Sequence, residues 1–498
     1  MIYTSYIGGG KTMKKNTSTF VLTLPLVTSI SDKSALDKYF ELSRKYYNAV
    51  LGKLLKRHYL MIQSKKYMVA SKLPKGKERD RLFNELEREY GIKGTMLNKL
   101  ITSLRTNEFK SLGSHITIKL QLRASLAIDR LKYKVAKKIN FIKYAEMRSF
   151  ESSDNIQGIK FRDNVIIFNK LKLPIIINRN DIYAHIALQD RVKYCRIKRE
   201  FIKGKYHYYV QLILEGIPPT KFNKKTGEIR HYINDGFVGL DIGTQTIGIC
   251  SNSEVKLLEL VPEVKNIERQ KRTLQRKMDR SRIITNPNKY NENNTIKNND
   301  NSKWNKSKHY IKIQMKFKEL FRKQREIRKQ SHNKLANYVL TLGNNIKVET
   351  MNYKGLQARA KNTTINEKTG KFNKKKRFGK SLANKAPSMF LTILDNKLKW
   401  IDKELKKINT WKVKASQYNH IEDKFIKKEL NDRWNDFGDF KIQRDLYSSF
   451  LIMNVNDDLS SINKDLCFKK FQEFKILHDI EVKRLKNLVL PVALKNVI

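Results

Sequence analysis

The chain has 498 residues, more than one ordinary domain holds, so its length predicts two to four domains. It carries 103 Lys and Arg residues against 48 Asp and Glu residues, and the formal net charge of +55 makes the chain repel itself unless a polyanion binds it. Nucleic acid is the partner that this excess predicts, and the alternative is a lysine-rich composition spread over solvated faces. The three separated cysteines, Cys195, Cys250 and Cys467, exclude a cysteine zinc site and argue against a disulfide scaffold.

The N-terminal part of the chain predicts a β domain interrupted by helices. Residues 20–27 predict a strand, and no apolar run reaches the ~20 residues of a membrane span, so a cytoplasmic protein is expected. Residues 32–144 repeat apolar side chains at intervals of three and four, which predicts helices, with Ser31 or Asp32 as the first N-cap. Between residues 158 and 216 the period changes to two, which predicts strands that turn at KGK.

After a linker predicted at 220–235, the chain continues with the stretch FVGLDIGTQTIGIC. Its apolar residues predict a strand that ends at Asp241 and a second strand that folds back as a hairpin. Gly239 and Gly243 permit close approach of another backbone. The segments predicted beyond this hairpin are basic helices at 265–282 and 308–340, and loops at 286–307 and 361–380.

Three interpretations of Asp241 are open. The sequence DIGTQT resembles the first phosphate loop of sugar kinases and actin-like ATPases, but that loop normally opens such a protein and no second loop of the type follows. An aspartate that closes a tight hairpin is the second interpretation. The third, a metal ligand, requires further carboxylates that folding brings to the same place.

Two further carboxylates stand where such partners are expected. Glu349 ends a short alternating strand in NNIKVETMNYKGL, and Asp445 opens an apolar helix in KIQRDLYSSFLI. Taken singly, Glu349 is an exposed strand end and Asp445 a first-turn charge or cap. Taken with Asp241, they can hold two Mg2+ ions roughly 3.5–4 Å apart, an arrangement that hydrolyses phosphodiesters.

The same carboxylates carry a family resemblance. Their order, in VGLDIGTQTIGI, IKVETMNYKGL and QRDLYSSFL, resembles the RuvC-type nuclease domain of the TnpB proteins, from which type V CRISPR effectors descend. The resemblance is specific over 237–452 and loose over 18–216. It implies a multidomain α/β fold with a RuvC/RNase H-like catalytic domain, a β wedge domain and a helical recognition insert. The implied domains are the wedge at 1–31 and 151–219, the recognition domain at 32–150, and the nuclease domain at 236–498 with a finger region at 410–440.

The resemblance also implies an activity, that of a transposon-associated or CRISPR-associated RNA-guided DNA endonuclease. Such an enzyme hydrolyses DNA at targets that match a guide RNA and lie beside a short motif. Asp241, Glu349 and Asp445 are the implied ligands of two Mg2+ ions, for which Mn2+ can substitute. The implied partners are a guide RNA and double-stranded target DNA in a prokaryotic cytoplasm, at the nucleoid when bound. The expected nucleic-acid contacts are Arg272, Arg276 and Arg280 on the basic helix, and Arg444, which either steadies the scissile phosphate or is structural.

One departure from the family concerns the finger. The family places two Cys pairs between the second and third carboxylates, whereas the corresponding positions here hold Asn419 and Glu422, then Trp434 and Phe437. These groups cannot bind zinc, so no zinc is expected, and Trp434 and Phe437 are expected to replace it with a small apolar cluster. The loss keeps open a rival function, that of a guide-dependent DNA-binding repressor with weak or no cleavage. A transposase that joins DNA strands is a second rival.

Overall fold

The computed structural model describes residues 18–104, 107–223, 225–264, 266–297, 302–349, 351–360, 362–367, 369–370, 372–373, 378–427, 429, 432–487 and 494. The chain divides into two compact units between Pro219 and Thr220. Residues 1–17, which the wedge prediction includes, lie outside the described part. Within the described part, no helix has both the length and the apolar character that a membrane crossing needs.

The first unit is built on a four-stranded antiparallel sheet in the order β1-β7-β6-β2, accompanied by a three-stranded sheet, β3-β4-β5. The first and last strands of the unit are neighbours, with Phe20 opposite Leu214, so the intervening helices form an insert in one β structure. The predicted change of period and the turn at KGK are confirmed, since the turn joins β6 to β7. The strands of this unit are β1 (Thr19–Pro25), β2 (Ser149–Glu151), β3 (Ile159–Arg162), β4 (Val165–Phe168), β5 (Leu171–Pro174), β6 (Val192–Ile202) and β7 (Lys205–Glu215).

The helices of the first unit share one hydrophobic core with its sheets. The first helix begins two residues earlier than expected, because Ser29 is its N-cap and Asp32 occupies the third helical position, so the N-cap prediction was wrong. The Asp32 carboxylate accepts the Ser29 backbone N–H at 2.9 Å, which completes a capping box. The helical elements are α1 (Ile30–Gln63), α2 (Lys65–Lys72), α3 (Lys77–Glu89), α4 (Thr95–Leu104), η1 (Asn107–Leu112), α5 (Gly113–Lys132) and α6 (Ile182–Ala187).

The second unit contains a five-stranded mixed sheet in the order β10-β9-β8-β11-β12. The predicted hairpin is confirmed as β8 and β9, which are antiparallel, whereas β11 lies parallel to β8 on its other side. The strands are β8 (Phe237–Ile242), β9 (Thr246–Ser251), β10 (Val255–Glu259), β11 (Asn345–Glu349) and β12 (Lys406–Lys407), with β13 (Tyr418–Asn419), β14 (Lys424–Phe425), β15 (Trp434–Asp436) and β16 (Lys441–Gln443) in two small hairpins.

Strand alternation gives this sheet two different faces. Val238, Leu240 and Ile242 of β8 point into a core shared with α8 and α11. The intervening residues, Gly239 and Asp241, face the opposite side, where α13 packs. The helices of the unit are α7 (Glu268–Thr285), α8 (Lys308–Leu342), α9 (Tyr353–Leu356), α10 (Gly379–Lys385), α11 (Pro387–Lys399), α12 (Thr410–Val413), α13 (Arg444–Met453) and α14 (Lys464–Lys486), with a short turn η2 (Pro287–Lys289).

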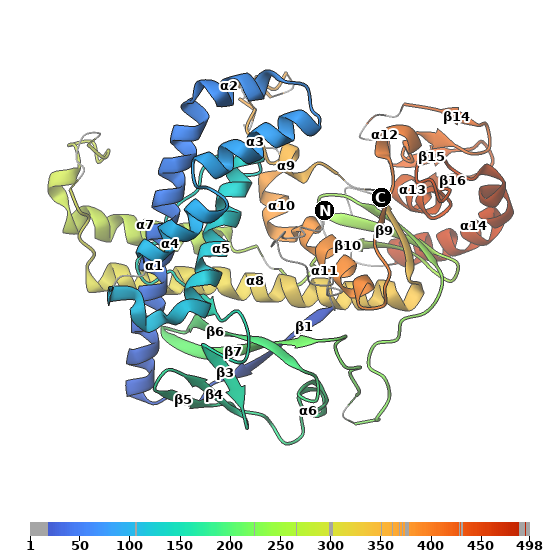
Figure 1. The fold of residues 1–498 in the computed structure, drawn as a ribbon. Helices are drawn as coiled ribbons and strands as arrows, with labels where there is room; N and C mark the ends of the chain where they lie inside the picture. The colour runs from blue at the N-terminus through green and yellow to red at the C-terminus, as the bar shows by residue number, and fades with distance from the viewer. Residues whose placement is uncertain are drawn as a thin grey trace. The chain divides into compact units, whose positions relative to one another are not determined.

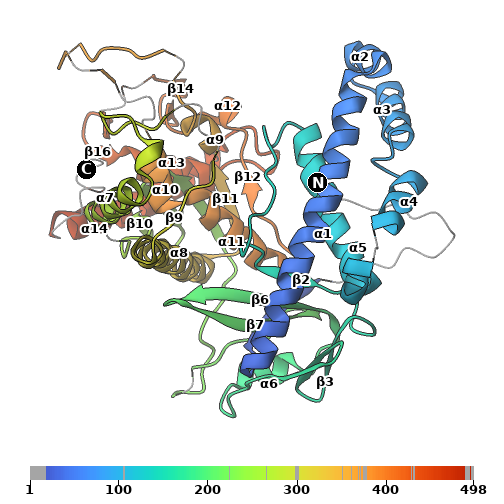
Figure 2. The ribbon, with the colours of Figure 1, turned by 90° about the vertical axis from the view of Figure 1, so that its left-hand side faces the viewer.

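The predicted basic helices are confirmed as α7 and α8. Figure 1 shows α8 as one continuous rod, and Figure 2 views α7 and α8 close to their axes, side by side. The C-terminal part of α8 packs on α11 and the sheet, while its N-terminal part accompanies α7. Residues 298–301, in the predicted Asn-rich loop, lie outside the described part, as do residues 361, 368, 371 and 374–377 of the loop predicted at 361–380.

Candidate active site

Two of the predicted carboxylates occupy neighbouring strands at the same level. The parallel pairing of β8 with β11 places Glu349 directly opposite Asp241. Both residues belong to the sheet face that is turned away from the α8 and α11 core, because the alternate residues on each strand enter that core. Neighbouring strands are ~4.8 Å apart, so the two side chains emerge beside one another. Folding thereby brings together two carboxylates that are more than 100 residues apart in the sequence.

The third carboxylate is brought to the same face by the packing of α13. A Cβ on Gly248 would lie 2.6 Å from the Asp445 carbonyl oxygen, and a Cβ on Gly239 would lie 2.0 Å from the Ser449 carbonyl oxygen. Gly248 is the cross-strand partner of Asp241. The first turn of α13 therefore rests on the sheet at the level of Asp241, at a distance that only glycine permits.

The start of α13 is held by its own cap and by a buried histidine. The Gln443 side chain accepts the Leu446 backbone N–H at 2.8 Å, and the Gln443 backbone N–H donates to His478 Nε2 at 3.0 Å. Because Nε2 accepts, the His478 proton resides on Nδ1, which lies 2.9 Å from Asp479 Oδ1. Burial lowers the pKa of His478, which favours this neutral form. These bonds fix the residue that precedes the Arg444–Asp445 pair.

Burial and mutual repulsion dominate the electrostatics of the three carboxylates, and Arg444 offsets them in part. Burial raises the pKa of Asp241 well above its usual range, and the nearby Asp445 and Glu349 raise it further. Burial also raises the pKa of Glu349 and of Asp445, and Arg444 lowers the pKa of Asp445 and Asp241. Like charges that raise one another's pKa repel when ionised, and a divalent cation removes that repulsion.

The donor atoms fit Mg2+, which prefers carboxylate oxygens and keeps several waters. The Ser448 hydroxyl adds to this fit, because its Oγ is buried without a full hydrogen-bond partner and lies near enough to Asp241 to lower its pKa. Within the described residues, no three His, Cys, Asp or Glu side chains are already drawn together at metal-binding distances. An ion would therefore have to draw the three carboxylates inward.

The predicted arginines fall into two places. Arg444 is mostly buried; one terminal nitrogen donates to the carbonyls of Glu429 and Asp432, and its Nε lies 3.5 Å from Asp445 Oδ1. These bonds tie it to the finger region and to the third carboxylate. The other three arginines lie exposed on α7, one turn apart along one side of the helix. The structure thus separates a positioning arginine at the carboxylates from a basic row on α7.

The finger region is held by aromatic packing. Phe437 stacks on Phe440 with ring centres 5.2 Å apart and meets Tyr447 edge-on at 5.4 Å, which confirms the predicted apolar cluster for this residue. Trp434 lies elsewhere, edge-on to His478 at 6.3 Å. Asn419 makes a turn by accepting the Ile421 N–H at 3.0 Å, and Glu422 lies exposed in that turn.

A histidine that the sequence reading passed over lies at the centre of this cluster. His420 is fully buried, and the Tyr447 hydroxyl both accepts its backbone N–H at 3.2 Å and donates to its Nδ1 at 2.6 Å. The ring of Phe471 lies 4.7 Å from the imidazole. Burial lowers the pKa of His420 to about 4. A neutral imidazole inside aromatic rings thus occupies the place next to the first expected zinc position.

Sequence reasoning also misjudged one glycine and missed another. A Cβ on Gly243 would come no closer than 3.5 Å to a neighbour, so the close approach expected there was wrong. Gly248, on the returning strand, makes that approach instead. A glycine in the middle of an apolar strand, on the same face as Asp241, was the available signal. His478 had no comparable signal, because its partner is a backbone N–H.

The chain is similar to solved structures of known proteins but matches no family model. No protein-family model matches the chain, and no curated protein matches it. Among solved structures, the chain is similar to a cryo-EM structure of a Cas12f1–sgRNA–target DNA complex, with a TM-score of 0.37 and 10% identity over 88% of this chain and 99% of that chain. It is also similar to a CRISPR-Cas12f ternary complex, with a TM-score of 0.25 and 12% identity over 84% of this chain and 82% of that chain. Both are type V CRISPR effectors, the class that the carboxylate motifs resemble.

Proposed function

We propose that this protein is an RNA-guided DNA endonuclease with a RuvC/RNase H-like catalytic domain in its second unit. One observation carries the proposal: Asp241 and Glu349 stand in register on parallel strands while α13 seats Asp445 against the same sheet face. A hairpin-closing aspartate would need neither partner. The strand register and the close packing of α13 on Gly248 and Gly239 together favour a single carboxylate site over three unrelated strand and helix ends.

In this proposal the three carboxylates hold Mg2+, which when bound supplies the charge that activates a water nucleophile and stabilises the leaving oxygen. Asp241 pairs with Glu349 on one side and with Gly248, on which α13 rests, on the other. Glu349 and Asp445 approach from the neighbouring strand and the helix. Arg444 holds the finger-region carbonyls and Asp445 together, so its role is to position that carboxylate.

The partners proposed are a guide RNA and double-stranded target DNA. The net charge of +55 supports a polyanionic partner, and the exposed basic row on α7 supplies a place for one. The choice of RNA and DNA follows from the family resemblance, and the matched Cas12f1 structure contains sgRNA and target DNA. The interrupted β structure of the first unit would then be the wedge, and its inserted helices the recognition domain.

The test begins with the RNA that co-purifies when the protein is expressed with its native flanking DNA. That complex is incubated with Mg2+ and a plasmid library in which the matching target lies beside randomised bases. Asp241→Ala and Glu349→Gln samples run alongside, and Asp439→Asn, an exposed carboxylate of the same region, is the matched control.

A discrete RNA, with cleavage that survives in the control and is lost in both site variants, supports the proposal. A discrete RNA with target binding and no cleavage in any sample would replace the nuclease with a guided repressor. Absence of a discrete RNA would refute the guided function and leave an unguided nuclease or a transposase.

A further inference from the structure

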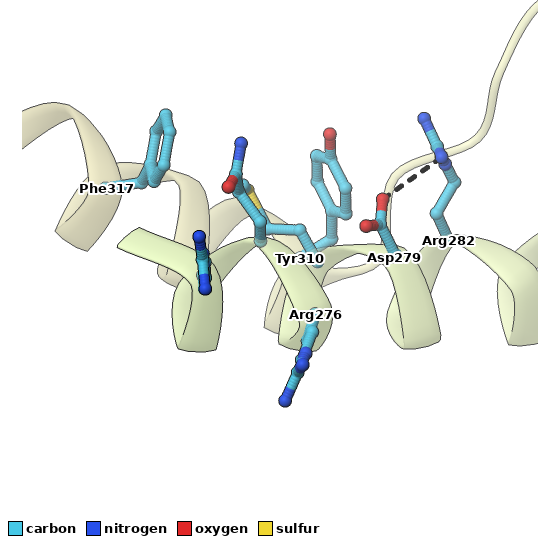
Figure 3. Close-up of a pocket in the computed structure, with 8 residues that line it drawn as sticks. Arg276, Asp279, Arg282, Tyr310 and Phe317 are labelled. Carbon is cyan, nitrogen blue, oxygen red and sulfur yellow. Dashed lines mark hydrogen bonds and ion pairs between the residues drawn. The ribbon is translucent and has the colours of Figure 1, made fainter. Parts of the chain in front are cut away.

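A cleft lies between α7 and the N-terminal half of α8, away from the carboxylates. Its volume is about 640 Å3, within the ~300–1,000 Å3 typical of sites that enclose small ligands. In Figure 3, Tyr310, Phe317 and Arg282 extend to one side of the helix pair and Arg276 extends to the other. The residues that line the cleft include Arg272, Asp279, Arg282, Tyr310 and Phe317.

The aromatic residues of the cleft are not core residues. Tyr310 and Phe317 are seven residues apart on α8, so they lie on one face of the helix about 10 Å apart along its axis. Both rings are half-buried, and Ser281 is the one buried residue of α7, all of which is described. Between them, α7 and the N-terminal half of α8 bury few residues, Ser281 and Ile313 among them. Phe317 meets Phe321 at 4.9 Å between ring centres, and both Tyr310 and Phe317 keep part of their surface exposed.

The charge around these rings is strongly positive. The 18 residues of α7 include seven Lys or Arg residues and two acidic ones. Asp279, which lines the cleft, is paired with Arg282 at 3.1 Å, so the ionised carboxylate is already balanced. Such a helix has little apolar burial to offset its own repulsion, and a bound polyanion would stabilise it.

A second hollow continues the cleft past Tyr310. It shares Arg282 and Tyr310 with the first and adds Trp304, and its volume is about 210 Å3. The Trp304 ring lies between two cations, with the Arg282 guanidinium at 5.3 Å and Lys289 Nζ at 4.8 Å from its centre. Aromatic faces and cations thus alternate along one track.

We propose that this track binds unpaired nucleotides of a single nucleic-acid strand, with bases stacked on Tyr310 and Phe317 and a phosphate on Arg272. Stacking on aromatic side chains along a positive groove is how proteins bind single strands with little sequence preference. In a duplex the bases are stacked on one another inside the helix, so they cannot stack on these rings. An acidic protein would neutralise the Lys and Arg side chains of α7 but has no bases to stack on the two rings. The identity of the strand, guide RNA or DNA, rests on the proposed function; the stacking chemistry does not.

The experiment uses the full-length protein, freed of co-purifying RNA, and two 12-nucleotide probes of one sequence, one RNA and one DNA. Each probe carries 2-aminopurine, whose fluorescence is quenched by stacking. The variants are Tyr310→Leu with Phe317→Leu, to remove both rings, and Tyr310→Phe, to keep the ring and its packing. Arg272→Ala removes a cleft cation, and Arg269→Ala removes one from the same helix outside the cleft.

Loss of both rings is expected to weaken single-strand binding at least tenfold and to abolish the quench, with the salt dependence of binding unchanged. Tyr310→Phe should bind like the parent. Arg272→Ala should weaken binding and reduce the slope of log affinity against log salt by about 0.7, more than Arg269→Ala does. Tighter binding of the RNA probe would identify the guide as the source, and tighter binding of the DNA probe a displaced strand.

Binding and quenching that survive the loss of both rings would overturn the inference. Equal losses from Arg272→Ala and Arg269→Ala, with no effect of the rings, would overturn it too. The result is separable from the cleavage test. If binding depends on the two rings but the protein never cleaves DNA, the inference about the cleft stands and the proposed nuclease activity is refuted. If the protein cleaves DNA but binding does not depend on the rings, the nuclease proposal stands and the inference about the cleft is refuted.

Discussion

Replacing Gly248 with alanine tests the seat of α13 directly. The new Cβ would lie 2.6 Å from the Asp445 carbonyl oxygen and 3.2 Å from its carbonyl carbon, and both are backbone atoms that cannot rotate away. The first turn of α13 must retreat by about 0.8 Å before the closer contact reaches the ordinary 3.4 Å. Overpacking of this kind costs roughly 1–3 kcal/mol of folding free energy. A displacement near 1 Å at a catalytic group costs about 100-fold in rate.

Two other glycines of this sheet complete a graded series. Gly239→Ala would place a Cβ 2.0 Å from the Ser449 carbonyl oxygen, so its destabilisation should exceed that of Gly248→Ala. Gly243→Ala is the matched control, since its nearest neighbours lie at 3.5 and 3.6 Å and it should change stability by less than about 0.5 kcal/mol. Urea unfolding measures the stability of each variant, and single-turnover cleavage of a matched target measures the rate. Equal stability and cleavage across all three variants would refute the seating of α13 on glycine.

Three further outcomes are expected. Asp241→Asn should raise the free energy of unfolding in EDTA by about 1 kcal/mol or more, because it removes a buried carboxylate and its repulsion with Asp445 and Glu349. Cleavage in Mg2+ should fall at least 1,000-fold. A variant no more stable than the parent would contradict the clustering of the three carboxylates. Phe471→Ala should destabilise the finger region by ~3–5 kcal/mol in chemical unfolding, because Phe471 packs on the buried His420. Stoichiometric zinc in metal analysis of the parent protein would contradict this aromatic replacement. His420 has its pKa lowered to about 4, so the unfolded chain takes up its proton first: the stability it contributes is complete above pH 6.5 and falls by about 3 kcal/mol as the pH drops to 4. His420→Gln should flatten that part of the pH profile in chemical unfolding, and an unchanged slope would exclude His420 as its origin.

Local patterns of the sequence were enough to identify the elements that carry the site. Alternation in FVGLDIGTQTIGIC predicts the β8–β9 hairpin, and the three- and four-residue repeats predict the basic helices. The choice of Asp241, Glu349 and Asp445 came from their places at strand and helix ends, and from the chemistry that carboxylates share. These properties depend on neighbours along the chain, so they can be read from it.

Tertiary structure alone decided how the three carboxylates meet. The register that places Glu349 beside Asp241 joins strands more than 100 residues apart, and no local pattern encodes it. Gly248 looks like any strand glycine until α13 lies against it, and His478 acts on a backbone N–H that sequence does not distinguish. Residue identity determined which chemistry was available, and long-range packing determined where its atoms stand, because close approach and strand register are properties of pairs that only the fold brings together.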